Sequence, residues 1–140
     1  MLYDLQYFIL TKYDTQIFDY LKTRKDFLQL IDCNAIMSEL QLKEAIRKTE
    51  RYIQHNGKIH FPGNVLLMYL SNTNQINVAI KRCGINSKTH HGVVVFSNTA
   101  DVDFLVSEGF LKLTGRLIPY DLPEKDFEVF SNMAKVDTTI

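Results

Sequence analysis

The chain has 140 residues, no net charge, 46% hydrophobic residues and 23% charged residues. These values are typical of a single globular domain with a real core, and they argue against an intrinsically disordered protein. No apolar run reaches the roughly 18–20 residues that a membrane span needs, and the N-terminal residues lack the pattern of a signal peptide. We therefore expect a cytoplasmic protein that does not cross a membrane.

The first part of the chain predicts two strands joined by a short helix. Residues 2–11 are rich in Tyr, Phe, Ile and Leu, as strands are, and residues 27–36 (FLQLIDCNAI) predict the second strand. Between them, Asp14 or Thr15 is a suitable N-cap for a helix that runs through Leu21.

The clearest helical pattern follows Ser38, which is a suitable N-cap, and ends at Gly57. Its apolar face has spacings of three and four residues and consists of Leu42, Ala45, Ile46, Thr49 and Ile53. The next apolar segment, NVLLMYL at residues 64–70, is too short for its sequence to distinguish a helix from a strand.

The second half of the chain continues with alternating element types. The segments with predicted structure are a strand at residues 92–97, a helix at 100–109, a strand or extended segment at 110–118, and a helix after Pro123 that carries Phe127, Phe130, Met133 and Ala134. This order predicts a single domain of the α+β (mixed α/β) class over residues 1–140, with helices packed on a central, mostly antiparallel sheet.

The neutral total charge conceals a basic middle segment. Between Lys43 and His91 there are eight lysines and arginines against two glutamates, and the flanking segments are acidic. On the long predicted helix, Lys43, Arg47 and Arg51 are four residues apart and form a stripe beside the apolar face. Such a stripe suits a polyanion, although an ordinary solvated helix face has the same pattern.

Catalytic and metal-binding motifs are not evident in the sequence. It has no glycine-rich phosphate loop and no nucleophile or zinc-protease motif. The four histidines lack a third or fourth partner at metal-ligand spacing, and we expect them to be surface or capping residues. Cys33 and Cys83 lie far apart, as buried reduced thiols often do. We therefore predict no catalytic residues, no metal site and no cofactor.

Residues 71–75 (SNTNQ) interrupt the apolar pattern with five consecutive small or amide side chains. Ser71 or Thr73 is a suitable cap for the helix that follows, whose apolar positions are Ile76, Ala79, Ile80 and Cys83 and which ends at Gly84. One cap does not require five polar residues. A helix start surrounded by amides offers backbone N–H groups and adaptable donors, which suit a phosphate or an unpaired base edge.

Val78 lies about 200° from Ile76 on the same predicted helix, away from its apolar face. An apolar side chain on the polar side of a helix is a candidate contact for a protein partner. We therefore select Val78 as the candidate partner-binding residue.

The segment NVLLMYLSNTNQINVAIKRCGINSKTHHGVVVFSN resembles the family of the small tRNA-binding subunit of the KEOPS (EKC) complex, the PRPK-binding protein (TPRKB) family. The similarity consists of the apolar run, the polar turn ending in Gln75-Ile76, the Ala79-Ile80 and Gly84-Ile85 pairs, and the strand Val93–Phe96. The upstream segment IDCNAIMSELQLKEAIRKT also fits, and the length matches a whole member.

This resemblance implies a non-enzymatic subunit that docks on the kinase-like ATPase subunit of KEOPS and supports threonylcarbamoyladenosine modification of tRNA. Archaeal members of the family bind the 3′ CCA end of tRNA. The residues that we expect to contact tRNA are Lys43, Arg47, Arg51, Lys58, Asn74, Gln75 and Lys81.

The chain departs from the family pattern at two positions. Val65 stands where many members have an acidic residue, and Asn74 stands where many have an arginine. The second departure removes a basic contact. Together with the zero net charge, it leaves open the alternative that the protein is an interaction module that stimulates the ATPase subunit without binding RNA. A small-molecule enzyme is a third possibility.

Overall fold

The computed structural model describes residues 2–57, 59–116, 133 and 136. The elements are, in chain order, β1 (Asp4–Leu10), α1 (Thr15–Thr23), β2 (Leu28–Asp32), the 3₁₀ helix η1 (Cys33–Ala35), α2 (Glu39–Asn56), α3 (Pro62–Ser71), α4 (Ile76–Cys83), β3 (His91–Phe96), α5 (Thr99–Ser107) and β4 (Leu111–Thr114). They form a single α+β domain, which confirms the predicted fold class.

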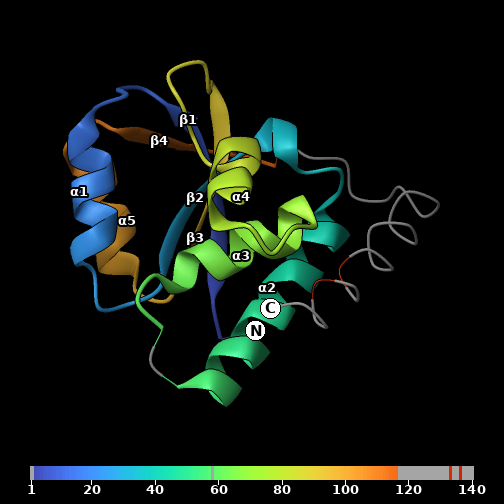
Figure 1. The fold of residues 1–140 in the computed structure, drawn as a ribbon. Helices are drawn as coiled ribbons and strands as arrows, with labels where there is room; N and C mark the ends of the chain where they lie inside the picture. Colours follow the sequence, from blue (N-terminus) through green and yellow to red (C-terminus); the bar gives the residue numbers. More distant parts are fainter. Residues whose placement is uncertain (1, 58, 117–132, 134–135, 137–140) are drawn as a thin grey trace.

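The four described strands form one antiparallel sheet in the order β2-β3-β1-β4, with helices on both faces (Figure 1). Alternating side chains on the strands enter two separate cores. Phe8, Leu30 and Val94 pack with α1 and α5 on one face. The opposite face packs against α2, α3 and α4 through side chains that include Ile31 and Val93. The sheet is therefore the middle layer of three.

The pairing of the central strands requires a glycine at position 92. A Cβ atom on Gly92 would overlap the Phe8 ring and the Ile31 carbonyl oxygen. This close approach lets the Phe8 ring lie across the strand beside it, where the ring is fully buried.

Helix α2 forms as its sequence predicts. The Ser38 hydroxyl accepts a hydrogen bond from the backbone N–H of Gln41 at 3.0 Å, and Gly57 ends the helix with a φ of 67°. The predicted apolar positions Leu42, Ala45 and Ile46 are fully buried in the core. The capping chemistry and the helical spacing therefore determine this element together.

Residues 64–70 lie in a helix, α3, which begins with Pro62 in its first turn and ends at Ser71. Every residue from Val65 to Leu70 is buried, because α3 lies against the sheet and between α2 and α4. A helix that is apolar all round has no periodicity to read, so its type is decided by packing.

The predicted strand at residues 27–36 is wrong beyond Asp32. The Asp32 side chain accepts a hydrogen bond from the backbone N–H of Asn34 at 2.9 Å and caps η1. A short acidic side chain that bonds its own backbone two residues on favours a turn over a strand.

The remaining predictions at the C-terminal end differ in outcome. Strand β4 lies inside the predicted segment 110–118, and helix α5 begins one residue before the predicted helix at 100–109 and ends at Ser107. In the predicted last helix, Met133 and Val136 are helical and buried in the core of α2, α3 and α4. Phe127, Phe130 and Ala134 lie outside the described residues.

Candidate functional site

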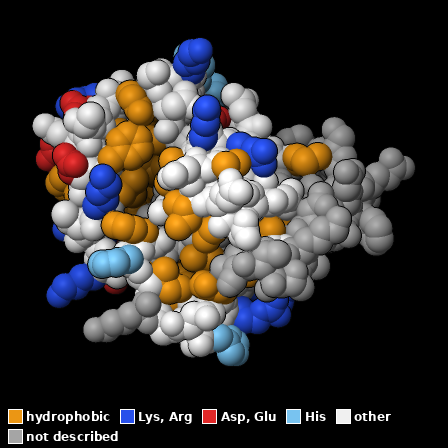
Figure 2. Space-filling view, viewed as in Figure 1, with side chains coloured by type: hydrophobic (Ala, Val, Ile, Leu, Met, Phe, Trp, Pro, Cys, Tyr) orange, Lys and Arg blue, Asp and Glu red, His pale blue; other side chains and the backbone are white. Residues whose placement is uncertain are grey.

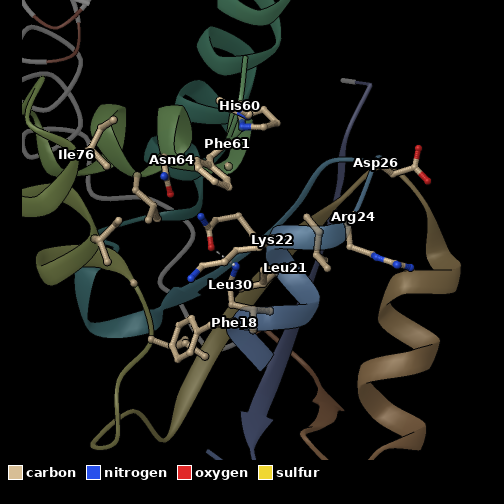
Figure 3. Close-up of a pocket in the computed structure, with 18 residues that line it drawn as sticks. Phe18, Leu21, Lys22, Arg24, Asp26, Leu30, His60, Phe61, Asn64 and Ile76 are labelled. Atoms are coloured by element: carbon tan, nitrogen blue, oxygen red, sulfur yellow. Dashed lines mark hydrogen bonds between the residues drawn. The ribbon is translucent and has the colours of Figure 1, made fainter. Parts of the chain in front are cut away.

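A pocket of about 480 Å³ lies between α1 and the α3–α4 pair, beside the edge strand β2 (Figure 3). Its lining is mainly apolar and consists of Phe18, Leu21, Lys22, Arg24, Asp26, Leu28, Gln29, Leu30, His60, Phe61, Pro62, Gly63, Asn64, Leu67, Ile76, Ile80, Gly84 and Ile85. In the space-filling view, orange side chains gather over the same region, with lysine, arginine and histidine side chains near its border (Figure 2). A concave apolar site with a few polar groups is the usual form of a ligand site.

The pocket exists because the helices on the two faces of the sheet meet beyond the edge of β2. Strand β2 pairs with β3 on one side, and on the other side an isolated antiparallel bridge joins Ile31 to Gly84. The part of the edge before that bridge, Leu28 to Leu30, lines the pocket. There the side-chain Oε1 of Gln29 accepts a hydrogen bond from the backbone N–H of Leu30 at 2.9 Å.

Helix α4 contributes two exposed apolar side chains to the pocket. Ile76 and Ile80 are 46% and 42% exposed, whereas Ala79 and Cys83 on the same helix are buried. The sequence predicts a single apolar face for these four residues. The structure divides that face, because Ala79 and Cys83 turn into the core and the two isoleucines line the pocket.

The cationic residues of the pocket are Lys22, Arg24 and His60, with Asp26 as the one acidic lining residue. Lys22 is exposed and makes no ion pair with any residue that the structure describes. The His60 ring stacks on the ring of Phe61, with centroids 5.5 Å apart. Lys22 is therefore available to a ligand, and the exposed His60 imidazole lines the pocket beside Phe61.

The guanidinium of Arg24, at the edge of the pocket, is held toward α5 by Tyr20 and Asp101. Its guanidinium lies 4.4 Å from the centre of the Tyr20 ring and 3.8 Å from Oδ1 of Asp101, which is buried. The Tyr20 hydroxyl donates a hydrogen bond to the same Asp101 oxygen at 2.7 Å. Burial and the hydrogen bond to Asp101 raise the pKa of Tyr20. In Figure 3 the Arg24 side chain accordingly points toward α5.

The amide-rich turn at residues 71–75 connects α3 to α4. Ser71 is not a cap, because it is the last residue of α3 and its hydroxyl donates to the Leu67 carbonyl at 2.7 Å. The hydroxyl of Thr73 accepts from the backbone N–H of Gln75 at 3.2 Å, and Gln75 is the N-cap residue without a side-chain capping bond. Asn72 adopts the left-handed conformation, with a φ of 57°, which asparagine tolerates better than most residues.

Asn74 and Gln75 are both exposed and directly precede Ile76 of the pocket wall. Neither lines the pocket itself. Their amides are therefore placed by the chain at the start of α4, next to the pocket rather than inside it.

The basic stripe of α2 is partly engaged within its own helix. Lys43 Nζ lies 3.2 Å from the Glu39 carboxylate, and Arg47 Nε donates to the Glu44 carboxylate at 3.0 Å. Arg51 is exposed on the same helix. The pocket lining includes no residue of α2.

Glu39 is buried and carries a second ion pair, in which Arg116 Nε lies 2.6 Å from its carboxylate. Burial and then the nearby Glu39 charge raise the pKa of Tyr7 to about 12. The Glu39 carboxylate thus joins α2 to the segment after β4.

Two further candidates from the sequence have different positions. Lys81 is exposed in the last turn of α4 and does not line the pocket. Lys58 lies outside the described residues. The contacts expected between tRNA and the basic residues remain predictions.

Val78, the candidate partner contact, is half-buried on α4. The pattern placed it on the polar side of that helix. Ile76 and Ile80 are the more exposed apolar residues of α4. Their exposure could not be predicted from the sequence, because they have the same helical spacing as the buried residues of this helix. The role of Val78 remains a prediction.

The two cysteines are held in the thiol form. Burial raises the pKa of Cys33 and of Cys83 to about 11. Across the described part of the chain, no group of histidine, cysteine and acidic residues is placed to hold a metal ion. No described helix is long and apolar enough to cross a membrane.

The chain matches the model of a known protein family. Its description is "Kinase binding protein CGI-121", and it matches residues 11–138. No curated protein matches the chain in a sequence search. The match begins directly after β1 and includes α4 and every residue of the pocket. The chain therefore belongs to the CGI-121 family of kinase-binding proteins.

Proposed function

We propose that this protein is a non-catalytic, cytoplasmic subunit of the KEOPS complex. In this role it docks on the kinase-like ATPase subunit, binds the 3′ CCA end of tRNA and supports threonylcarbamoyladenosine modification. Membership of a kinase-binding family supports the docking role. The observation that carries the RNA role is the apolar pocket with cations at its opening and exposed amides beside it.

A single-stranded RNA end has the chemistry that this surface fits. Bases pack on apolar and aromatic surfaces, and phosphates attract lysines. Phe18 and Phe61 supply aromatic lining, and the exposed Lys22 lines the same pocket. Asn74 and Gln75 at the start of α4 add donors and acceptors for base edges or phosphates.

For the ATPase subunit we propose a contact on α4 that includes Val78. Replacing Val78 by glutamate places a charge in a half-buried apolar position and is expected to weaken partner binding at least tenfold. Unchanged affinity, in a variant that melts like the wild type, would remove Val78 from the interface.

A second function is favoured by the ion pairs on α2. Because Lys43 and Arg47 are matched by Glu39 and Glu44, the predicted basic stripe is weaker than its sequence suggests. The protein would then stimulate the ATPase subunit through protein contacts alone.

One titration separates the two functions. The protein is titrated with full-length tRNA and with the same tRNA lacking CCA, each at two salt concentrations. Salt-sensitive binding that falls at least tenfold without CCA supports the RNA role. Equal affinity for both RNAs contradicts it and favours the protein-interaction role.

A further inference from the structure

The edge of β2 inside the pocket is covered by one side chain, that of Gln29. Its Oε1 accepts from the Leu30 N–H at 2.9 Å, a place that a neighbouring strand would fill in a larger sheet. Its Nε2 donates no hydrogen bond to any residue that the structure describes, although the side chain lines the pocket. Gln29 therefore offers a free donor inside an apolar site.

The position of this amide is fixed by a glycine on the facing helix. A Cβ atom on Gly63 would lie 2.9 Å from Gln29 Nε2 and 3.1 Å from the Leu28 carbonyl oxygen. The missing side chain of Gly63 thus gives the amide room at the start of α3. Because Oε1 is held by Leu30, the orientation that places Nε2 near Gly63 is set by the backbone.

The shape of the open edge indicates which ligand it can accept. The Ile31–Gly84 bridge closes β2 immediately after Leu30, so the exposed stretch is too short for an added peptide strand. One flat group with a hydrogen-bonding edge fits this space. The aromatic rings of Phe18 and Phe61 line the same pocket, and Lys22 and His60 lie at its opening. An apolar pocket with a fixed amide donor and basic side chains in its lining suits a base attached to a phosphate.

We propose that Gln29 recognises the terminal base of the RNA 3′ end, donating from Nε2 to an acceptor on the base edge. This inference rests on the proposed function and assigns a residue and a position to it. The base lies among the pocket's apolar side chains, and the last phosphate lies near Lys22. The Leu30 N–H keeps its partner throughout, so the edge of the sheet need not open.

The test compares short RNAs that end in CCA with the same RNAs carrying an abasic terminal nucleotide. For the wild-type protein, loss of the base is expected to weaken binding about tenfold. The variants are Gln29→Met, which removes the donor without adding charge, and Gln29→Glu, which keeps an acceptor for Leu30. In both, the ratio between the normal and abasic RNAs is expected to fall to about twofold. The matched control is Gln54→Met, an exposed position on α2, and it should keep the tenfold ratio.

The other outcomes each overturn a defined part of the proposal. A Gln29 variant that weakens both RNAs equally, with the ratio preserved, shows a structural role and overturns base recognition. Binding of free AMP that depends on Gln29, with no difference between the two RNAs, overturns the RNA end as occupant. If CCA removal weakens tRNA binding but the Gln29 ratio is unchanged, only this inference fails. If CCA removal has no effect, the proposed function fails first.

Discussion

Cations of the same type have different surroundings on α2 and at the pocket. On α2, Lys43 and Arg47 lie beside Glu39 and Glu44, which are three or four residues away on the same helix. At the pocket, Lys22 has no ion-pair partner among the described residues and stands over an apolar surface. The availability of a cation for a ligand therefore depends on its neighbours, and clustering along the sequence is a poor guide to it.

The largest predicted effect concerns the thiols, one of which lies near each region. Cys33 precedes α2, and Cys83 ends α4 beside Gly84 of the pocket. Since burial raises the pKa of both thiols from 9.0 to about 11, alkylation at pH 8 should be about 100-fold slower than for a free thiol. The rate should rise as the pH approaches 11, measured by mass spectrometry.

The same pKa shifts make stability depend on pH. Below about pH 8.5 the thiols are protonated in both the folded and the unfolded state, so they do not change stability. Between pH 9 and 11 the unfolded protein loses these protons and the folded protein keeps them, because the folded pKa values are raised to about 11. The free energy of unfolding therefore falls as the pH rises through this range. Alkylation of Cys83 at the rate of a free thiol would show that α4 opens and that the pocket wall is not preformed.

The second prediction concerns the ion pairs of Glu39 on α2. In Glu39→Gln the buried carboxylate that pairs with Lys43 and Arg116 becomes a neutral amide. Losing both ion pairs is expected to lower the free energy of unfolding by about 2 kcal/mol, measured by urea denaturation. Glu44→Gln on the same helix is the control, because its pair with Arg47 is more exposed and should contribute under about 0.5 kcal/mol. Equal stability of the two variants would contradict this reading of Glu39.

The third prediction concerns the charge of Lys22 at the pocket. Lys22→Glu replaces an available cation by a negative charge and should weaken RNA binding about tenfold at moderate salt. Lys25→Glu is the matched control, since Lys25 is exposed on the following loop and does not line the pocket. Because both variants change the net charge equally, an equal loss of affinity would indicate a diffuse field instead of a site.

The smallest effect is expected from the Arg47–Glu44 ion pair on α2. If Arg47 is weak in binding because Glu44 neutralises it, then Glu44→Gln should raise RNA affinity about twofold at low salt. Fluorescence anisotropy at two salt concentrations can detect this change. A loss of affinity in Glu44→Gln would mean that the ion pair positions Arg47 for binding.

Much of the fold could be predicted from local chemistry. Ser38 and Gly57 bound α2, and the apolar spacing between them gives its buried face. The type of residues 64–70 could not be predicted, because α3 is buried on every side and has no polar face. The strand expected through Ile36 stops at Asp32, where a side chain bonds the backbone of a turn.

Less of the candidate site than of the fold could be predicted from the sequence. The amide-rich turn and Ile76 direct attention to the start of α4, where Ile76 lines the pocket. Lys22 and His60 were missed, because 37 residues separate them and only the packing of α1 and α3 around the edge of β2 brings them to one pocket. The sequence at the end of α1 has three basic residues, Lys22, Arg24 and Lys25, which are typical of an ordinary helix end.

Amide chemical shifts of ¹⁵N-labelled protein, recorded during titration with a CCA trinucleotide, test the pocket as the RNA site most directly. The backbone amides of Lys22, Gln29, Leu30, Ile76 and Ile80 should shift in a saturable way, while those of Lys43, Arg47 and Arg51 should not. Shifts confined to α2, with the pocket amides unchanged, would contradict the account and return the basic stripe as the binding surface.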